Sequence, residues 1–206
     1  MGSPLVLKLG SGLVITQDKY KEAMRAINRM TRTDVMVGIP EEDALRDATP
    51  EDPNPPTNAL LGYVHEHGDP SRNLPARPFL VPGVEESKEQ WIKTLETAAI
   101  LAFRGDEAGM RAALGRAGQR AVTAVQEVIR RQDFAPLAPS TIEERIRKIA
   151  VINPKLAEKY SKMSPSEKIQ FESDNITILI DTGSMFRAIT WVLRDKGSTA
   201  DYISVE

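Results

Sequence analysis

The sequence predicts an α+β fold, in which a small antiparallel sheet packs against two long helices and a helical insertion precedes a C-terminal hairpin. Three patterns lead to this prediction. Long segments repeat apolar residues at spacings of three and four, as helices with one buried face do. Short segments near residue 35 and near the C-terminus are rich in strand-forming residues, and three helix-start signals fall between residues 140 and 167. The 206 residues suffice for a core, so we expect one domain over residues 1–206.

Composition excludes several classes of protein. The chain has no cysteine, which excludes disulfides, thiolate metal sites and a cysteine nucleophile. A formal net charge of −2 gives no general attraction to nucleic acid or to an acidic membrane. No apolar run reaches the roughly 18 residues that a membrane span needs. The N-terminus lacks a basic region followed by an apolar core, so we expect no signal peptide and folding in a cytoplasm.

The first third predicts an arm, a helix, a strand and a loop. Leu5–Leu9 and Leu13–Ile15 are apolar runs separated by Gly-Ser-Gly, which predicts a hairpin or an extended arm. A helix starts at Thr16, and Asp34–Ile39 predicts a strand that ends at a proline. Residues 41–56 hold six acids, one arginine and four prolines, so we expect a mobile surface loop. The apolar stripe of the helix comprises Tyr20, Ala23, Met24, Ile27 and Met30.

The middle third predicts three helices and a stiff elbow. Thr57 or Asn58 caps a helix over Ala59–His67, which ends at a glycine. Two prolines flank an arginine in Leu74–Leu80, and prolines make such a segment stiff and extended. A helix then runs from about residue 83 to residue 103, and the strongest helix of the chain covers Glu107–Gln132. Its apolar seam, suited to a partner helix, comprises Met110, Leu114, Ala117, Ala121, Val125 and Val128.

Arginines occupy the other faces of this long helix. A solvated face is the plainest interpretation. A surface turned to a neighbouring subunit, or to passing DNA, is the alternative, and DNA binding would fall steeply with salt. These arginines are Arg111, Arg116, Arg120, Arg130 and Arg131.

The last third predicts short helices followed by strands. Ser140 with Glu143, and Ser164 with Glu167, match the capping-box pattern, and Asn153 caps a helix between them. Together they predict a helical insertion over residues 146–175. Extended segments are then expected at Ile176–Ile180, Ile189–Leu193 and Tyr202–Val205. Between the first two, Asp181-Thr182-Gly183 predicts a shape-setting turn, and Thr182 or Ser184 would cap a short helix over Met185–Arg187.

Candidate chemistry is sparse. His65 and His67 are two apart on a helix and point about 200° from each other, so they cannot grip one ion as an i, i+4 pair does. A metal-dependent hydrolase using His65, His67 and nearby acids is therefore only an alternative, and His67 suits the negative end of the helix dipole. The Asp181–Ser184 turn is similar to phosphate or nucleophile turns in composition alone. We expect no enzyme, no catalytic residue, no cofactor and no metal.

Several pieces of the chain, taken in order, match a known family. They are DVMVGIP (Asp34–Pro40), NALLGYVHEHG (Asn58–Gly68), LPARPFLVPG (Leu74–Gly83), and the pair APLAPSTIEER (Ala135–Arg145) and LIDTGSMFRAI (Leu179–Ile189). This ordered set resembles the neck and tail-completion proteins of tailed bacteriophages, which are also described as tail components or virion morphogenesis proteins. Two departures stand out. The family commonly has HEFG where this chain has HEHG, and the stretch over residues 146–175 is longer than the family pattern.

The resemblance implies a structural virion protein of the neck or tail, present in the host cytoplasm during assembly. It implies a homo-oligomeric ring that joins the head connector or portal adaptor to the tail, or terminates the tail tube or sheath. DNA would pass through the ring without sequence-specific binding, and no membrane is involved. A tail-assembly factor that is absent from the mature particle is the alternative. No catalytic residue carries over from the family.

A set of residues is expected at subunit interfaces or at turns that set the shape of the subunit. We also expect Gly183→Val to disrupt folding or ring assembly and Ser184→Ala to do little. The set comprises Pro75, Arg77, Pro78, Phe79, Arg116, Arg120, Asp181, Thr182, Gly183 and Trp191.

Overall fold

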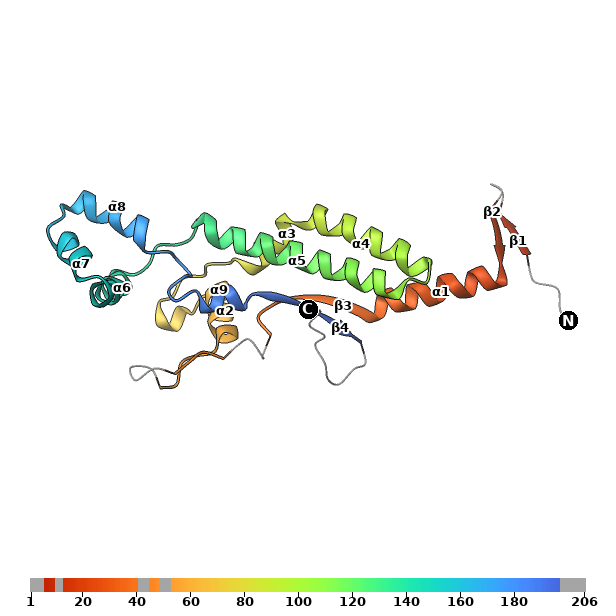
Figure 1. The fold of residues 1–206 in the computed structure, drawn as a ribbon, viewed down its shortest axis with the longest axis horizontal. Coiled ribbons are helices and arrows are strands. Elements are labelled where there is room, and N and C mark those ends of the chain that lie inside the picture. Colours follow the sequence, from red (N-terminus) through yellow and green to blue (C-terminus); the bar gives the residue numbers. More distant parts are fainter. Residues whose placement is uncertain (1–5, 10–12, 41–44, 49–52, 197–206) are drawn as a thin grey trace. The chain divides into compact units, whose positions relative to one another are not determined.

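The structure is a computed structural model that describes residues 6–9, 13–40, 45–48 and 53–196. It mixes helices with two-stranded sheets, which confirms the α+β prediction (Figure 1). The chain divides into two compact units. The first contains Met1–Val37, Glu86–Thr123 and Thr190–Glu206, and the second contains Gly38–Glu85 and Ala124–Ile189. Each unit is assembled from separate stretches of the chain, and the single-domain boundaries stay a prediction.

The core of the first unit lies where three helices meet one strand. Helix α1 (Gln17–Arg32) packs on α4 (Lys88–Phe103), and the start of α5 (Glu107–Arg131) and strand β4 (Thr190–Asp195) complete the core. Most of the buried side chains are small, so the helix backbones approach closely. The buried cluster comprises Ala26, Ala98, Ala102, Met110, Ala113, Leu114 and Leu193.

Strand β3 (Thr33–Gly38) pairs with β4, as the sequence predicts. Successive contacts run in opposite directions along the two strands, so the pair is antiparallel. The Lys196 amide donates to the Arg32 carbonyl at 2.6 Å, and the Thr33 hydroxyl donates to the Asp195 carboxylate at 2.7 Å. Arg111 of α5 also binds Asp195. The Thr33 hydroxyl, followed by Arg111, holds the pKa of Asp195 below its ordinary value.

Two glycines of α5 leave room for the indole ring of Trp191 against the helix. A Cβ on Gly115 would lie 2.6 Å from the Trp191 ring, and one on Gly118 would lie 2.7 Å from it. The Trp191 indole N–H donates to the Gln119 side chain at 3.2 Å. The glycines that cost helix propensity therefore admit a large aromatic side chain against the α5 backbone.

Most of the apolar stripe predicted on α1 is not core, although Met30 packs against the core. Tyr20, Met24 and Ile27 are 59%, 39% and 43% exposed, whereas Ala26 is fully buried. Helix α1 contacts α4 through the side that carries Ala26 and Met30. Because successive residues are about 100° apart around a helix, the side that carries Tyr20, Met24 and Ile27 is turned away from that contact.

An antiparallel hairpin precedes α1, as predicted. Strand β1 (Val6–Leu9) pairs with β2 (Leu13–Thr16) in the register Val6↔Thr16 to Leu9↔Leu13. The last predicted strand, Tyr202–Val205, and most of the acidic 41–56 segment lie outside the described residues.

The second unit consists mainly of helices. They are α2 (Asn58–His67), the short 3₁₀ helix η2 (Pro70–Arg72), α3 (Leu80–Glu86), the end of α5, α6 (Pro139–Ile152), α7 (Pro154–Ser161), α8 (Pro165–Asn175) and α9 (Ser184–Ala188). Thr57 caps α2, Asn153 caps α7, and Ser164 and Glu167 form the predicted capping box of α8. These starts follow from local sequence alone.

Two helix predictions in this region are wrong. The helix expected over residues 83–103 is two helices, because α3 ends at Glu86 and α4 begins after Ser87. Helix α6 begins at Pro139, so Ser140 lies inside its first turn and makes no cap with Glu143. Proline at the first helical position explains the earlier start, because its fixed φ suits the helix and its missing N–H needs no partner there.

The strand predicted at Ile176–Ile180 is a turn. Thr177 and Ile180 form an isolated bridge, and Leu179 has φ of 65°. The Gln132 side chain accepts from the Ile178 amide at 2.5 Å and donates to the Ile178 carbonyl at 3.1 Å. These long-range hydrogen bonds satisfy the backbone groups that a strand partner would have satisfied.

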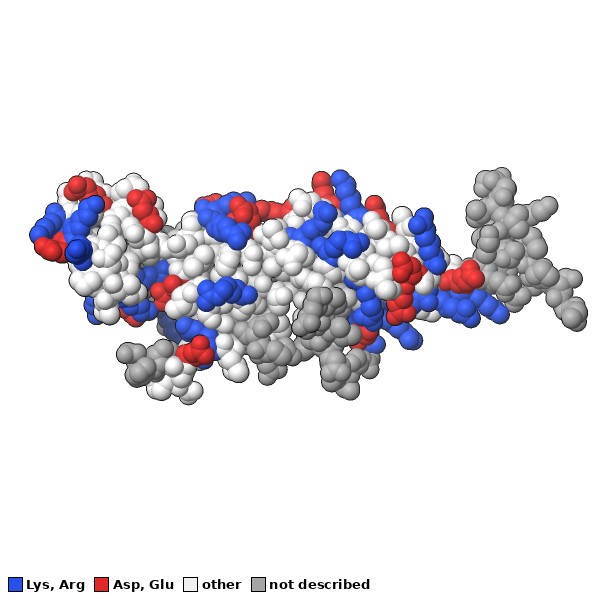
Figure 2. All heavy atoms as spheres, viewed as in Figure 1, with Lys and Arg blue, Asp and Glu red and all other residues white. Residues whose placement is uncertain are grey.

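No helix in the described part of the chain is long and apolar enough to cross a membrane. Figure 2 shows acidic and basic side chains interspersed on the face in view. The small formal net charge therefore reflects nearly equal numbers of basic residues, 27, and acidic residues, 29.

Candidate functional site

The Glu66 carboxylate, from the segment that resembles the family's helix motif, caps the N-terminus of α3. It accepts hydrogen bonds from the backbone amides of Phe79 at 2.7 Å, Leu80 at 2.8 Å and Val81 at 3.0 Å. The first amides of a helix have no partner within the helix, and a negative charge there also suits the helix dipole. Glu66 thus ties α2 to the proline-framed elbow.

Arg77, at the centre of that elbow, is 2% exposed. Its Nε donates to the Ala135 carbonyl at 2.8 Å, and its Nη2 donates to the Pro136 carbonyl at 2.8 Å. The planar guanidinium fits two acceptors at once, which lysine cannot do. Arg77 therefore joins the elbow to the segment after α5, which belongs to another of the family-like pieces.

Packing joins the same pieces. Phe79 is 2% exposed, and a Cβ on Gly62 of α2 would lie 3.8 Å from the Phe79 ring and 3.1 Å from Ile39. The side-chain amide of buried Asn58 donates to the Ser184 hydroxyl at 3.1 Å. Residues from VGIP, from α2, from the elbow and from the turn before α9 thus meet in the second unit.

The predicted turn at Asp181–Gly183 precedes α9. Asp181 accepts a hydrogen bond from Lys148 at 2.9 Å and lies 3.7 Å from Arg145. The Thr182 hydroxyl accepts from the Ser184 amide at 3.3 Å, and Gly183, with φ of 78°, is the N-cap residue of α9. The side chains of Asp181 and Thr182 thus bind Lys148, Arg145 and the Ser184 amide, which all belong to the same unit.

Gly183→Val is expected to lower the free energy of unfolding by about 2 kcal/mol, because a β-branched residue is strained at positive φ. Chemical denaturation measures the loss. Gly38→Val is the matched control, because a Cβ there meets nothing within 4 Å. Equal losses of stability in the two variants would contradict the role of the positive φ at Gly183.

Ser184→Ala is expected to lower the free energy of unfolding by about 1 kcal/mol, which is more than the small effect expected from the sequence, because Asn58 would lose the hydroxyl that accepts its hydrogen bond.

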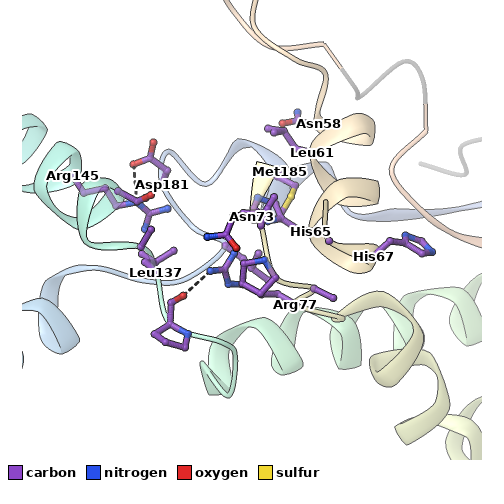
Figure 3. Close-up of a pocket in the computed structure, with 18 of the residues that line it drawn as sticks. Asn58, Leu61, His65, His67, Asn73, Arg77, Leu137, Arg145, Asp181 and Met185 are labelled. Atoms are coloured by element: carbon purple, nitrogen blue, oxygen red, sulfur yellow. Dashed lines mark hydrogen bonds and ion pairs between the residues drawn. The ribbon is translucent and has the colours of Figure 1, made fainter. Parts of the chain in front are cut away.

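These pieces surround a pocket of about 890 Å³, shown in Figure 3. Arg46, Arg77 and Arg145 line it, and among the described lining residues Asp181 is the one carboxylate. His65 also lines it, and its Nδ1 is buried without a hydrogen-bond partner in the described structure. Burial, followed by the charges of Arg77 and Arg145, lowers the pKa of His65.

The rings of His65 and His67 lie apart in the described structure. Figure 3 shows the two rings at separate places around α2. The His67 Nδ1 lies 3.0 Å from the Tyr63 carbonyl, and its ring stacks on the Tyr63 ring at 4.4 Å. Within the described ranges, no group of three or more His, Asp or Glu side chains could hold a metal ion. The hydrolase alternative therefore has no ligand set in the part of the chain that the structure describes.

The remaining predicted residues are spread over both units. Pro75 and Pro78 are exposed on the elbow, while Arg116 and Arg120 are exposed on α5. Trp191 is partly buried against the α5 glycines. Sequence reasoning did not single out Glu66, Gln132 or Arg145, whose partners are distant backbone groups. Glu66 and Arg145 stand within the family-like motifs, and that was the one available signal.

Neither protein-family models, nor curated proteins, nor solved structures give a match to this chain. The resemblance to neck and tail-completion proteins therefore depends on the motifs alone.

Proposed function

We propose that this protein is a structural subunit of a ring at the neck of a tailed bacteriophage. The ring joins the head connector to the tail or terminates the tail tube. Its subunits meet head to tail around an axis, and such contacts close into a ring when the rotation closes.

One observation carries the proposal: three polar residues of the family-like motifs bind residues of other motifs in the set. Glu66 caps α3, Arg77 holds two carbonyls, and Asn58 binds Ser184. None of these contacts brings a nucleophile together with a base. Residues with such partners give a subunit a fixed shape, and a ring subunit needs a fixed shape because small errors in angle accumulate around the axis.

Exposed apolar side chains in the first unit support self-association. Tyr20, Met24 and Ile27 lie along one side of α1. Ile100 and Phe103 are exposed near the end of α4. Exposed apolar patches of this kind mark interaction sites in soluble proteins. The mixed surface charge also suits a collar past which DNA slides without binding.

Ile27→Lys is expected to convert the purified oligomer to monomer, because a charge in the α1 stripe would be buried at the subunit contact. Light scattering coupled to size exclusion measures the mass. Glu22→Lys is the control, since it also places a lysine at an exposed position of α1, but about 140° around the helix from Ile27. A wild-type chain that is monomeric, alone and with connector and tube proteins, would refute the ring. Mass spectrometry of purified virions separates a resident subunit from a transient assembly factor.

A further inference from the structure

The pocket of the second unit carries more positive charge than its own carboxylate balances. Arg77 is buried, and its two described partners are neutral carbonyl groups. The Arg145 side chain is 15% exposed, and it shares Asp181 with Lys148. Arg46 adds a third guanidinium to the lining. Buried charges are normally paired with charges of opposite sign, so this lining favours an anionic ligand.

A buried polar atom also lacks a partner in this pocket. The Nδ1 of His65 has no hydrogen bond within the described structure. A buried polar nitrogen without a partner costs about 1–3 kcal/mol. With the ring proton on Nδ1, a ligand that supplies an acceptor oxygen would recover that free energy, and a carboxylate is a ligand that the adjacent guanidinium groups also favour.

Much of the rest of the lining is apolar and contains several prolines, beside polar side chains such as those of Asn73 and Thr141. A small inorganic anion would leave these surfaces uncovered. A peptide that carries both carboxylates and the apolar rings of proline would cover them. The apolar lining includes Leu61, Leu74, Pro136, Leu137, Pro139 and Met185.

We infer that this pocket binds an acidic, proline-containing peptide, and that its occupant is the 41–56 segment of a second copy of this chain. That segment has six acids, one arginine and four prolines, which complements both the charge and the lining of the pocket. The chain's own described part of the segment brings Arg46 to the pocket, which adds positive charge. The inference rests on the proposed ring, because it names one contact between neighbouring subunits.

The test uses the full chain with the six acids of its own 41–56 segment replaced by Gln or Asn, so that no copy's segment already occupies the pocket. A fluorescent synthetic peptide of the native residues 41–56 is added, and its binding is followed by anisotropy at low salt. We expect saturable binding that a control peptide with its six acids replaced by Gln or Asn does not show. Thr141 lines the pocket in the first turn of α6, where glutamate suits the helix. Thr141→Glu is expected to weaken binding at least about tenfold relative to Thr141→Gln, which has the same shape without the charge.

Equal binding of the acidic and the amide peptides would overturn the inference. So would equal affinities of the two Thr141 variants, or displacement of the peptide by inorganic phosphate at equal concentration. Binding that persists in a chain that stays monomeric would refute the ring and leave the pocket assignment intact. A ring that forms without any peptide binding would overturn the pocket assignment and leave the proposed ring intact.

Discussion

Glu66→Ala is expected to lower the free energy of unfolding by about 3 kcal/mol. The substitution removes the acceptor of three amide hydrogen bonds, at 2.7, 2.8 and 3.0 Å, and the negative charge at the N-terminus of α3. Hydrogen bonds to charged groups contribute about 1.5–3 kcal/mol each, and water reaching the vacated site would recover part of the loss. Urea denaturation followed by circular dichroism measures the change.

Two further variants make this result specific. Glu66→Gln keeps one acceptor oxygen and most of the shape, so we expect about half of the loss. Glu22→Ala removes an exposed carboxylate from α1, and we expect a change within about 0.5 kcal/mol. If Glu66→Ala were no worse than Glu22→Ala, the carboxylate would not be joining α2 to the elbow.

The elements that the sequence predicts well are those with local causes. Thr57, Asn153 and Ser164 cap the helices that they precede, because a side-chain oxygen beside the first free amides acts over only two or three residues. The β3–β4 pair was also predictable, because both segments carry the β-branched and aromatic residues that sheets favour.

The errors have causes that are distant along the chain. The apolar pattern at Ile176–Ile180 is strand-like, but Gln132 takes the backbone groups of Ile178 from 46 residues away. The stripe on α1 has helical periodicity, and periodicity cannot say whether this chain or a neighbouring copy covers it.

Some members of the candidate site, such as Arg77, were predictable from the sequence, but their contacts were not. Arg77 was expected at an interface or a turn, yet its acceptors lie 58 and 59 residues further along the chain. Every residue has a backbone carbonyl, so the sequence cannot indicate which carbonyls an arginine such as Arg77 will bind. The pocket likewise depends on three arginines that approach each other only in the folded unit.

Arg77→Met is expected to be the most destabilising of these substitutions, with a loss of about 3–5 kcal/mol. It removes two charged hydrogen bonds of 2.8 Å and leaves the carbonyls of Ala135 and Pro136 without that donor. Methionine keeps much of the apolar volume, so the loss reports mainly on the guanidinium. Arg77→Lys keeps the charge but reaches one carbonyl at most, and we expect an intermediate loss.

Arg72→Met provides the control, because the same substitution there removes an arginine whose side chain is 81% exposed and lies 3.4 Å from Asp69. Exposed pairs of this kind contribute little, so we expect less than about 0.5 kcal/mol. Comparable losses at Arg72 and Arg77 would contradict the structural role of Arg77. The lysine variant then separates two roles of Arg77: if stability falls while peptide binding persists, the fork geometry holds the elbow and the charge serves the pocket.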